Sequence, residues 1–214
     1  MRATGLFGGT FDPVHVGHIE LARHALEYCR LAEVIFIPAA SPPHKSRKHL
    51  TAFHHRVAML TLAIEGESRF SVCEVEKDLP PPTYTVDTLN HLLLKNTCDT
   101  EYYFIIGIDA FLDIHTWKEY EKVIGKVHFI VAARPGYTVS DLQECIASLH
   151  YQKKVDHWYN ASSKRKIYYL ELELADVSST DIRKTASSST LPKDAVAPAV
   201  FEYIKVHNLY SSGK

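Results

Sequence analysis

The sequence predicts a doubly wound α/β fold on a mostly parallel sheet. Two observations support this prediction: short runs of β-branched and aromatic residues alternate with helix-like segments, and most of these runs are almost continuously apolar. Continuous apolar runs are typical of strands buried on both faces of a parallel sheet. Alternation of strands and helices at this spacing indicates right-handed βαβ crossovers.

Each expected element follows from its own pattern. The apolar runs predict strands at Ala3–Phe7, Val34–Pro38, Phe70–Val75, Tyr102–Gly107, His128–Ala133 and Ile167–Leu172. Helical patterns lie at Val16–Cys29, Ala52–Ile64, Val86–Lys95, Tyr120–Val123 with its lead-in, Asp141–Leu149 and, as a closing helix, Pro198–Tyr210. Thr51 and Thr85 stand where helix N-caps are expected. The polar segment Tyr151–Lys166 is expected to form a surface excursion.

A single domain is expected over residues 1–214, with the C-terminal part from about residue 175 closing the sheet. The chain shows neither an internal repeat nor an obvious interdomain linker. Its 46% hydrophobic and 23% charged residues are ordinary for a soluble globular protein. A chain of this length should bury roughly 70% of its unfolded surface, which is enough for a large core.

Charge and cysteine usage exclude several classes of protein. With 24 Lys and Arg against 25 Asp and Glu, the chain has no overall field that would hold it on nucleic acid or a membrane. No apolar run reaches the ~18–20 residues of a membrane span, and the N-terminus lacks signal-peptide features. The four cysteines lie far apart, as in reduced cytosolic proteins. We therefore expect a cytoplasmic protein with neither a nucleic-acid nor a membrane partner; oligomerisation remains open.

A glycine-rich loop follows the first expected strand. Gly8 and Gly9 permit a ligand to approach the backbone closely, and Phe11-Asp12-Pro13 forces a turn. The helix that follows directs its free N–H groups and positive dipole end at the loop. The loop therefore predicts an anion-binding site.

His15 and His18 lie three residues apart at the start of that helix, so both can project to the same side. Neighbouring phosphates would favour their charged, hydrogen-donating forms. The alternatives are a turn with two exposed histidines or a metal-binding pair. We expect no metal site, because no third ligand lies at a suitable spacing and no cysteine cluster accompanies the pair.

A second candidate phosphate-binding segment is V-S-S-T-D-I-R at Val177–Arg183. A Ser-Ser-Thr run after a strand caps a helix and offers hydroxyl and N–H groups, and Arg183 can place its planar guanidinium on phosphate oxygens. The alternative is a capping box with a surface arginine. Two phosphate-binding helix starts suit a triphosphate better than one.

Four further positions are candidates for substrate contacts. Lys45 follows two prolines, where a basic loop could close over a phosphate. The Tyr84–Thr85 turn opens a helix whose free N–H groups could hold a small carboxylate. Asp109 follows a strand and could accept from ribose hydroxyls. Trp117 is either a core residue or a platform for a planar ring.

The first loop is neither a Walker A loop nor a G-x-G-x-x-G fingerprint. It resembles the H-x-G-H motif of the nucleotidylyltransferase superfamily, and Val177–Arg183 resembles that superfamily's I-S-S-T-x-x-R motif, with Val for Ile. Together with P-P-H-K, Y-T-V-D-T-L, I-G-I-D-A-F and A-R-P-G, these motifs resemble the bacterial nicotinate mononucleotide adenylyltransferase family over essentially the whole chain. The resemblance implies a Rossmann-like fold and adenylyl transfer from ATP, with Mg²⁺ on its phosphates, to nicotinate mononucleotide, giving deamido-NAD and pyrophosphate.

The resemblance also implies roles for individual residues. The catalytic residues, facing the ATP phosphates, would be His15, His18, Lys45 and Arg183. The other ATP-binding residues would be Gly8, Gly9, Thr10, Phe11, Gly107, Asp109, Ser179 and Thr180. Those that bind the mononucleotide would be Tyr84, Thr85, Trp117 and Arg134. Two alternatives to this reaction are the same transfer to nicotinamide mononucleotide or phosphopantetheine, and a protein that binds nucleotide as a sensor without catalysis.

Overall fold

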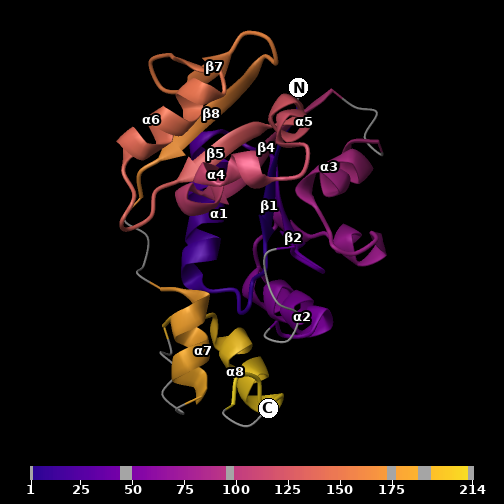
Figure 1. Ribbon diagram of the computed structural model, residues 1–214. Coiled ribbons are helices and arrows are strands. Elements are labelled where there is room, and N and C mark those ends of the chain that lie inside the picture. Colours follow the sequence, from indigo (N-terminus) through magenta and orange to yellow (C-terminus); the bar gives the residue numbers. More distant parts are fainter. Residues whose placement is uncertain (1, 44–49, 95–98, 173–176, 188–193, 212–214) are drawn as a thin grey trace.

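The computed structural model describes residues 2–43, 50–94, 99–172, 177–187 and 194–211 (Figure 1). Within this part of the chain, one sheet has the strand order β3-β2-β1-β4-β5-β8-β7-β6. The parallel strands are β1 (Arg2–Gly9), β2 (Glu33–Pro38), β3 (Phe70–Val72), β4 (Thr100–Gly107), β5 (His128–Ala132) and β8 (Arg165–Leu170). The predicted doubly wound, mostly parallel sheet is confirmed.

The helices form two groups, each with its own apolar core. One core contains residues of α1 (Val16–Tyr28), α2 (Phe53–Ala63), α7 (Ser179–Ser187) and α8 (Pro198–Val206). The other contains residues of α3 (Thr85–Leu94), α4 (Ile108–Leu112), α5 (Tyr120–Lys126) and α6 (Val139–Ser148). Strand residues alternate between the two cores: Phe7 and Ile105 belong to the first, Leu6 and Phe104 to the second. The period of two shows that the cores lie on opposite faces of the sheet.

The winding direction reverses between β1 and β4. The chain moves from β1 outward to β2 and β3, returns to β4 on the other side of β1, and continues outward to β5 and β8. In open α/β sheets, ligands bind outside the carboxyl ends of the strands at such a reversal. The fold therefore places the candidate site after Gly9 of β1 and Gly107 of β4.

The expectation of a surface excursion at Tyr151–Lys166 was wrong. This segment extends the sheet by two short antiparallel strands, β6 (Gln152–Lys153) and β7 (Trp158–Asn160), and leads into β8. Trp158 and Tyr151 are buried in the core on the α3–α6 side. Asn160 is also buried, and its side-chain N–H donates to the Leu149 carbonyl oxygen at 3.0 Å.

The two predicted threonine N-caps were also wrong. Ala52 is the N-cap of α2, and the backbone N–H of Thr51 donates to an Asp12 carboxylate oxygen 3.2 Å away. Thr85 is the first residue of α3. In both places the tertiary structure, and not the local preference for a hydroxyl cap, decides where the helix begins.

The two C-terminal helices pack at one end of the molecule (Figure 1, bottom). There α8 packs against α2, and the backbone N–H of Val16, at the start of α1, donates to the Ala195 carbonyl oxygen at 3.0 Å. The end of the chain therefore lies beside the loop that follows β1. No helix in the described ranges is long and apolar enough to cross a membrane.

Candidate active site

The loop after β1 is packed tightly against the core. A Cβ atom on Gly8 would lie 3.0 Å from the Phe104 ring, and one on Gly9 would lie 3.0 Å from the Phe11 ring. Phe11 adopts a left-handed backbone conformation, with φ of 48°. Phe11 is 1% exposed and its ring packs edge-on against Phe7, so it forms the hydrophobic floor of the loop. The loop thus presents backbone groups over a hydrophobic floor, as expected of an anion site.

The two histidines of this loop lie together, with ring centroids 3.7 Å apart. The backbone N–H of His15 donates to Nδ1 of His18 at 3.2 Å, so neutral His18 carries its proton on Nε2. His15 is 9% exposed, and its Nδ1 has no hydrogen-bond partner among the described residues. Burial and, to a lesser extent, the charge of Arg134 lower the pKa of His15 to about 4. Without a ligand, His15 is therefore neutral at pH 7, and the charged form expected from the sequence requires a nearby anion.

The second motif docks directly on the first loop. Ser179 Oγ donates to the Pro13 carbonyl oxygen at 2.9 Å, and Nη1 of Arg183 donates to the Asp12 carbonyl oxygen at 2.7 Å. Nη2 of Arg183 also donates to Thr180 Oγ1 at 3.2 Å. The two motifs, which are more than 160 residues apart in sequence, form one cluster of hydrogen-bond donors.

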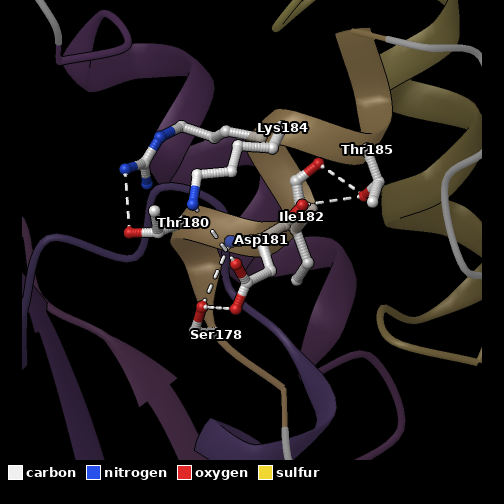
Figure 2. A network of polar contacts seen from close by, with 7 residues as sticks. Ser178, Thr180, Asp181, Ile182, Lys184 and Thr185 are labelled. Atoms are coloured by element: carbon white, nitrogen blue, oxygen red, sulfur yellow. Dashed lines mark hydrogen bonds and ion pairs between the residues drawn. The ribbon is translucent and has the colours of Figure 1, made fainter.

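Ser178 caps the helix that carries this second motif, as the sequence predicts (Figure 2). Its Oγ accepts the Asp181 N–H at 3.1 Å and donates to an Asp181 carboxylate oxygen at 2.5 Å. Asp181 also forms an exposed ion pair with Lys184 at 3.7 Å. The cap fixes the first turn of α7, from which Ser179, Thr180 and Arg183 extend.

Gly107 and Asp109 lie at the end of β4 together with Arg134. Asp109 Oδ1 and Arg134 Nε form an ion pair at 3.2 Å. A Cβ atom on Gly107 would lie 2.4 Å from that carboxylate oxygen and 2.7 Å from that guanidinium nitrogen, so only glycine leaves room for the pair. Arg134 thus lies beside Asp109 at the end of β4, and its charge also contributes to the lowered pKa of His15.

A cavity of about 780 Å³ opens beside this ion pair, lined by Asp109, Tyr84, Thr85, Trp117 and Lys118. A second cavity of about 180 Å³ is lined by Gly8, Gly9, Thr85 and Trp117. Trp117 and Thr85 border both cavities. The larger cavity is of the size typical of small-molecule sites, and the smaller one connects its wall to the glycine loop.

A buried carboxylate that the sequence reasoning missed supports the cavity wall. Glu76, in the 3₁₀ turn Val75–Asp78, is 8% exposed. It accepts the hydroxyls of Thr83 and Thr88 at 2.6 and 2.9 Å and the N–H of Ala40 at 3.0 Å. Glu76 thereby ties the start of α3 to the segment after β2. No motif marked it, because its partners lie up to 36 residues away.

Lys45, the remaining predicted catalytic residue, lies outside the described residues. The structure brings the other site candidates together as two adjoining groups. The phosphate-loop group contains Gly8, Gly9, Thr10, Phe11, His15, His18, Ser179, Thr180, Arg183, Gly107, Asp109 and Arg134. The cavity group contains Tyr84, Thr85 and Trp117, with Asp109 at the junction.

Comparison with known proteins agrees with this arrangement. The site combines three features of a nucleotidyltransferase: the switch point after β1, a helix that begins with H-x-G-H, and a second helix whose start docks on the same loop. The cytidylyltransferase-like family matches residues 6–185. A protein of Desulfotalea psychrophila described as "Probable nicotinate-nucleotide adenylyltransferase" is 39% identical, covering 98% of this chain and 100% of that protein. One of Clostridium tetani with the same description is 34% identical, with the same coverage of 98% and 100%. The chain belongs to the nicotinate-nucleotide adenylyltransferase family, and it is an enzyme of the nucleotidyltransferase class.

Solved structures show the same fold. The nicotinic acid mononucleotide adenylyltransferase of Plasmodium falciparum, complexed with NaAD, superposes with a TM-score of 0.74 at 23% identity, covering 98% of both chains. A second structure of that protein, complexed with APC, gives a TM-score of 0.73 at 22% identity with the same coverage. At this identity the likeness supports the Rossmann-like fold, and the assignment to the family depends on the sequence relatives.

Proposed function

We propose that this enzyme transfers the adenylyl group of ATP to nicotinate mononucleotide, giving deamido-NAD and pyrophosphate. The observation that carries the proposal is the docking of Ser179 and Arg183 on the loop that also holds His15 and His18. The side chains of both histidines and of Ser179 and Arg183 gather at this loop, and a cavity of about 780 Å³ opens beside Asp109. This arrangement suits a polyphosphate next to a second, smaller nucleotide.

ATP lies with its phosphates on the loop in this proposal. Gly8, Gly9, Thr10 and Phe11 offer backbone contacts, and Ser179 and Thr180 offer hydroxyls. His15, His18, Arg183 and Lys45 face the phosphates. Asp109 accepts from the ribose hydroxyls, and Gly107 leaves room for that carboxylate. Arg134, paired with Asp109, adds a positive charge at the same end of the site.

The mononucleotide lies in the larger cavity in this proposal. Trp117 offers a flat surface for the pyridine ring. The N–H groups at the start of α3, at Tyr84 and Thr85, favour a carboxylate on that ring, and Lys118 lies on the cavity wall with its ammonium paired to Asp87 at 2.9 Å. Asp109 lines this cavity and is paired with Arg134, so in this proposal Arg134 lies near the junction of the two nucleotides.

The reaction requires no general base. A phosphate oxygen of the mononucleotide, already anionic at neutral pH, attacks the α-phosphorus of ATP. The new P–O bond forms as the bond between the α-phosphorus and its bridging oxygen to the β-phosphate breaks, and pyrophosphate leaves with that electron pair. The enzyme holds two polyanions in line and neutralises the charge that develops on the α-phosphate and the leaving group. In this proposal His18, through Nε2–H, and Arg183 donate to these oxygens.

We propose that Mg²⁺ enters with ATP as part of the substrate. No group of three His, Cys, Asp or Glu side chains in the described ranges is arranged to hold a metal ion. The side chains of His15, His18, Ser179 and Arg183 at this loop can donate hydrogen bonds to phosphate oxygens. Phosphate oxygens and water would therefore supply most of the ligands of Mg²⁺, whose charge would offset part of that of the triphosphate.

The test is pyrophosphate release with ATP and Mg²⁺, run in parallel with nicotinate mononucleotide, nicotinamide mononucleotide and phosphopantetheine. We expect release with the first acceptor at a much higher kcat/KM than with the second, and none with the third. Comparable rates with the acid and the amide would keep adenylyl transfer but refute carboxylate selection at Tyr84 and Thr85. If the protein binds ATP but releases no pyrophosphate with any of the three acceptors, the proposal is refuted and a nucleotide sensor is favoured.

A further inference from the structure

A buried carboxylate lies beneath the phosphate-binding loop. Asp12 is 2% exposed and stands between the glycines and the two histidines. Its carbonyl oxygen accepts from Arg183, as described above, while its carboxylate points away from that contact, toward groups from two other parts of the chain. A buried charge of this kind is stable only when it is paired and hydrogen-bonded.

The first of these groups comes from the start of α2. The Thr51 N–H donates to Oδ2 of Asp12 at 3.2 Å. Arg56, which is 1% exposed, donates from Nε to the Thr51 carbonyl oxygen and from Nη1 to the Thr10 carbonyl oxygen, both at 2.8 Å. Burial lowers the pKa of Arg56, and the charge of Asp12 opposes that effect, so the two opposite charges stabilise each other.

The second group is the hydroxyl of Tyr210, which donates to Oδ1 of Asp12 at 2.7 Å. After α8 the chain turns back through two residues with left-handed backbone conformations, Asn208 (φ 49°) and Tyr210 itself (φ 64°). This conformation is tolerated by asparagine but is unfavourable for a bulky residue such as Tyr210, where it persists because other contacts compensate for it. Burial and the Asp12 charge raise the pKa of Tyr210 far above its usual value, so this hydroxyl stays protonated and acts as a donor.

We propose that Tyr210 is a positioning residue for adenylyl transfer. Its hydroxyl holds the Asp12 carboxylate and thereby fixes the loop that carries the two histidines. The same contact fixes the Asp12 carbonyl group, which orients Arg183. This inference rests on the proposed function. Tyr210 itself touches neither of the proposed substrates. Its effect passes through Asp12, because the same residue that accepts the Tyr210 hydroxyl also accepts the Arg183 guanidinium.

The test compares Tyr210→Phe with Tyr203→Phe. Tyr203 lies on α8 and forms a hydrogen bond of similar length, 3.0 Å, but to Nδ1 of His55 and not to the phosphate loop. Both variants lose one hydroxyl and keep the ring, so their effects on the packing of the C-terminal segment are matched. The melting temperature, the Kd for ATP, kcat and the KM of each substrate are measured for both variants.

For Tyr210→Phe, we expect the efficiency of ATP use, kcat/KM for ATP, to fall roughly 10-fold or more, the scale of one hydrogen bond to a charged group. The KM for the mononucleotide should stay within about two-fold of the wild-type value, since the Trp117 cavity does not depend on Asp12. Tyr203→Phe should leave the kinetic constants near wild type. Equal losses in both variants, or unchanged ATP kinetics in Tyr210→Phe, would overturn the proposal.

A double-mutant cycle with Asp12→Asn tests the route through Asp12. If Tyr210 acts through that carboxylate, Tyr210→Phe should cost much less in the Asp12→Asn background than in the wild type. Additive losses would overturn the proposal. The Kd for ATP separates this inference from the proposed reaction: weaker ATP binding in Tyr210→Phe alone supports the positioning role even if the wild-type enzyme releases no pyrophosphate.

Discussion

Gly107→Ala is the substitution whose consequence follows most directly from the geometry. The backbone of Gly107, with φ of −74° and ψ of 151°, is one that alanine adopts freely. The added methyl group would lie 2.4 Å from Asp109 Oδ1 and 2.7 Å from Arg134 Nε, distances that real Cβ atoms essentially never show. At least one of these two atoms must therefore shift; because each is near the end of a flexible side chain, the shift itself costs little, but it displaces the Asp109–Arg134 pair from its position at the end of β4.

The expected effect of Gly107→Ala is small on the free energy of unfolding and larger on kcat/KM for ATP. The Arg134 and Asp109 side chains are 51% and 38% exposed, so their ion pair contributes only about 0–1 kcal/mol to the free energy of unfolding. A hydrogen bond from substrate to the Asp109 carboxylate is worth about 1.5–3 kcal/mol. We therefore expect kcat/KM for ATP to fall roughly 10- to 150-fold, while the melting temperature changes by only a few degrees.

The assay is pyrophosphate release at varied ATP, with thermal unfolding measured on the same preparations. Gly125→Ala is the matched control, because a Cβ atom at Gly125 in α5 would meet nothing within 4 Å. It should keep wild-type kinetics and gain some stability, since alanine is favoured over glycine inside a helix. A folded Gly107→Ala enzyme with kcat/KM for ATP within two-fold of wild type would refute the placement of Asp109 at the ATP site.

Three further predictions concern the histidines and the cavity. His18→Ala should lower kcat about 100-fold, the scale of one lost transition-state donor, in pyrophosphate-release kinetics; a folded variant with near-normal kcat would exclude that role. Trp117→Ala should mainly raise the KM for the mononucleotide, and a loss confined to kcat would show that Trp117 is not a stacking platform. Burial lowers the pKa of His15 and His128 to about 4, so the folded protein binds fewer protons than the unfolded chain below pH 6.5. The free energy of unfolding should therefore be highest above pH 6.5 and fall towards pH 4, by up to roughly 3 kcal/mol per histidine. Urea unfolding at pH 7 and pH 4.5 measures this fall, which should be smaller in His128→Asn than in the wild type. An equal fall in both proteins would contradict this account.

The sequence was most informative where one physical pattern dominates. Most of the buried parallel strands read as nearly continuous apolar runs, and all six were predicted, although the expected Phe70–Val75 strand ends at Val72 and contains the exposed Ser71. The two missed strands, β6 and β7, are short and lie in a polar segment whose buried residues, Trp158 and Asn160, alternate with more exposed ones. Their pairing with β8 is antiparallel and local, and a pattern search for parallel strands does not detect it.

The site could be predicted only in part, for a related reason. The two phosphate-binding motifs are continuous in sequence, so their residue types and spacing were visible, and the structure brings them together. The groups that support them come from distant positions: Arg56 lies 46 residues from its partner Thr10, and Glu76 lies 36 residues from Ala40. No motif marked Arg56, which lies in a helix that also contains His54 and His55, and nothing in the sequence showed how far burial would lower the pKa of His15.

The contact between Asp12 and Tyr210 also has a consequence for biosynthesis, because it joins residues that are 198 positions apart. At translation rates of about 5–20 residues per second, the loop would leave the ribosome roughly 10–40 s before its last partner is made. During that time β1 can pair with β2, and α1 can fold, but the Asp12 carboxylate has only the start of α2 to hold it. The phosphate-binding loop is thus one of the first segments synthesised and one of the last to acquire its final contacts.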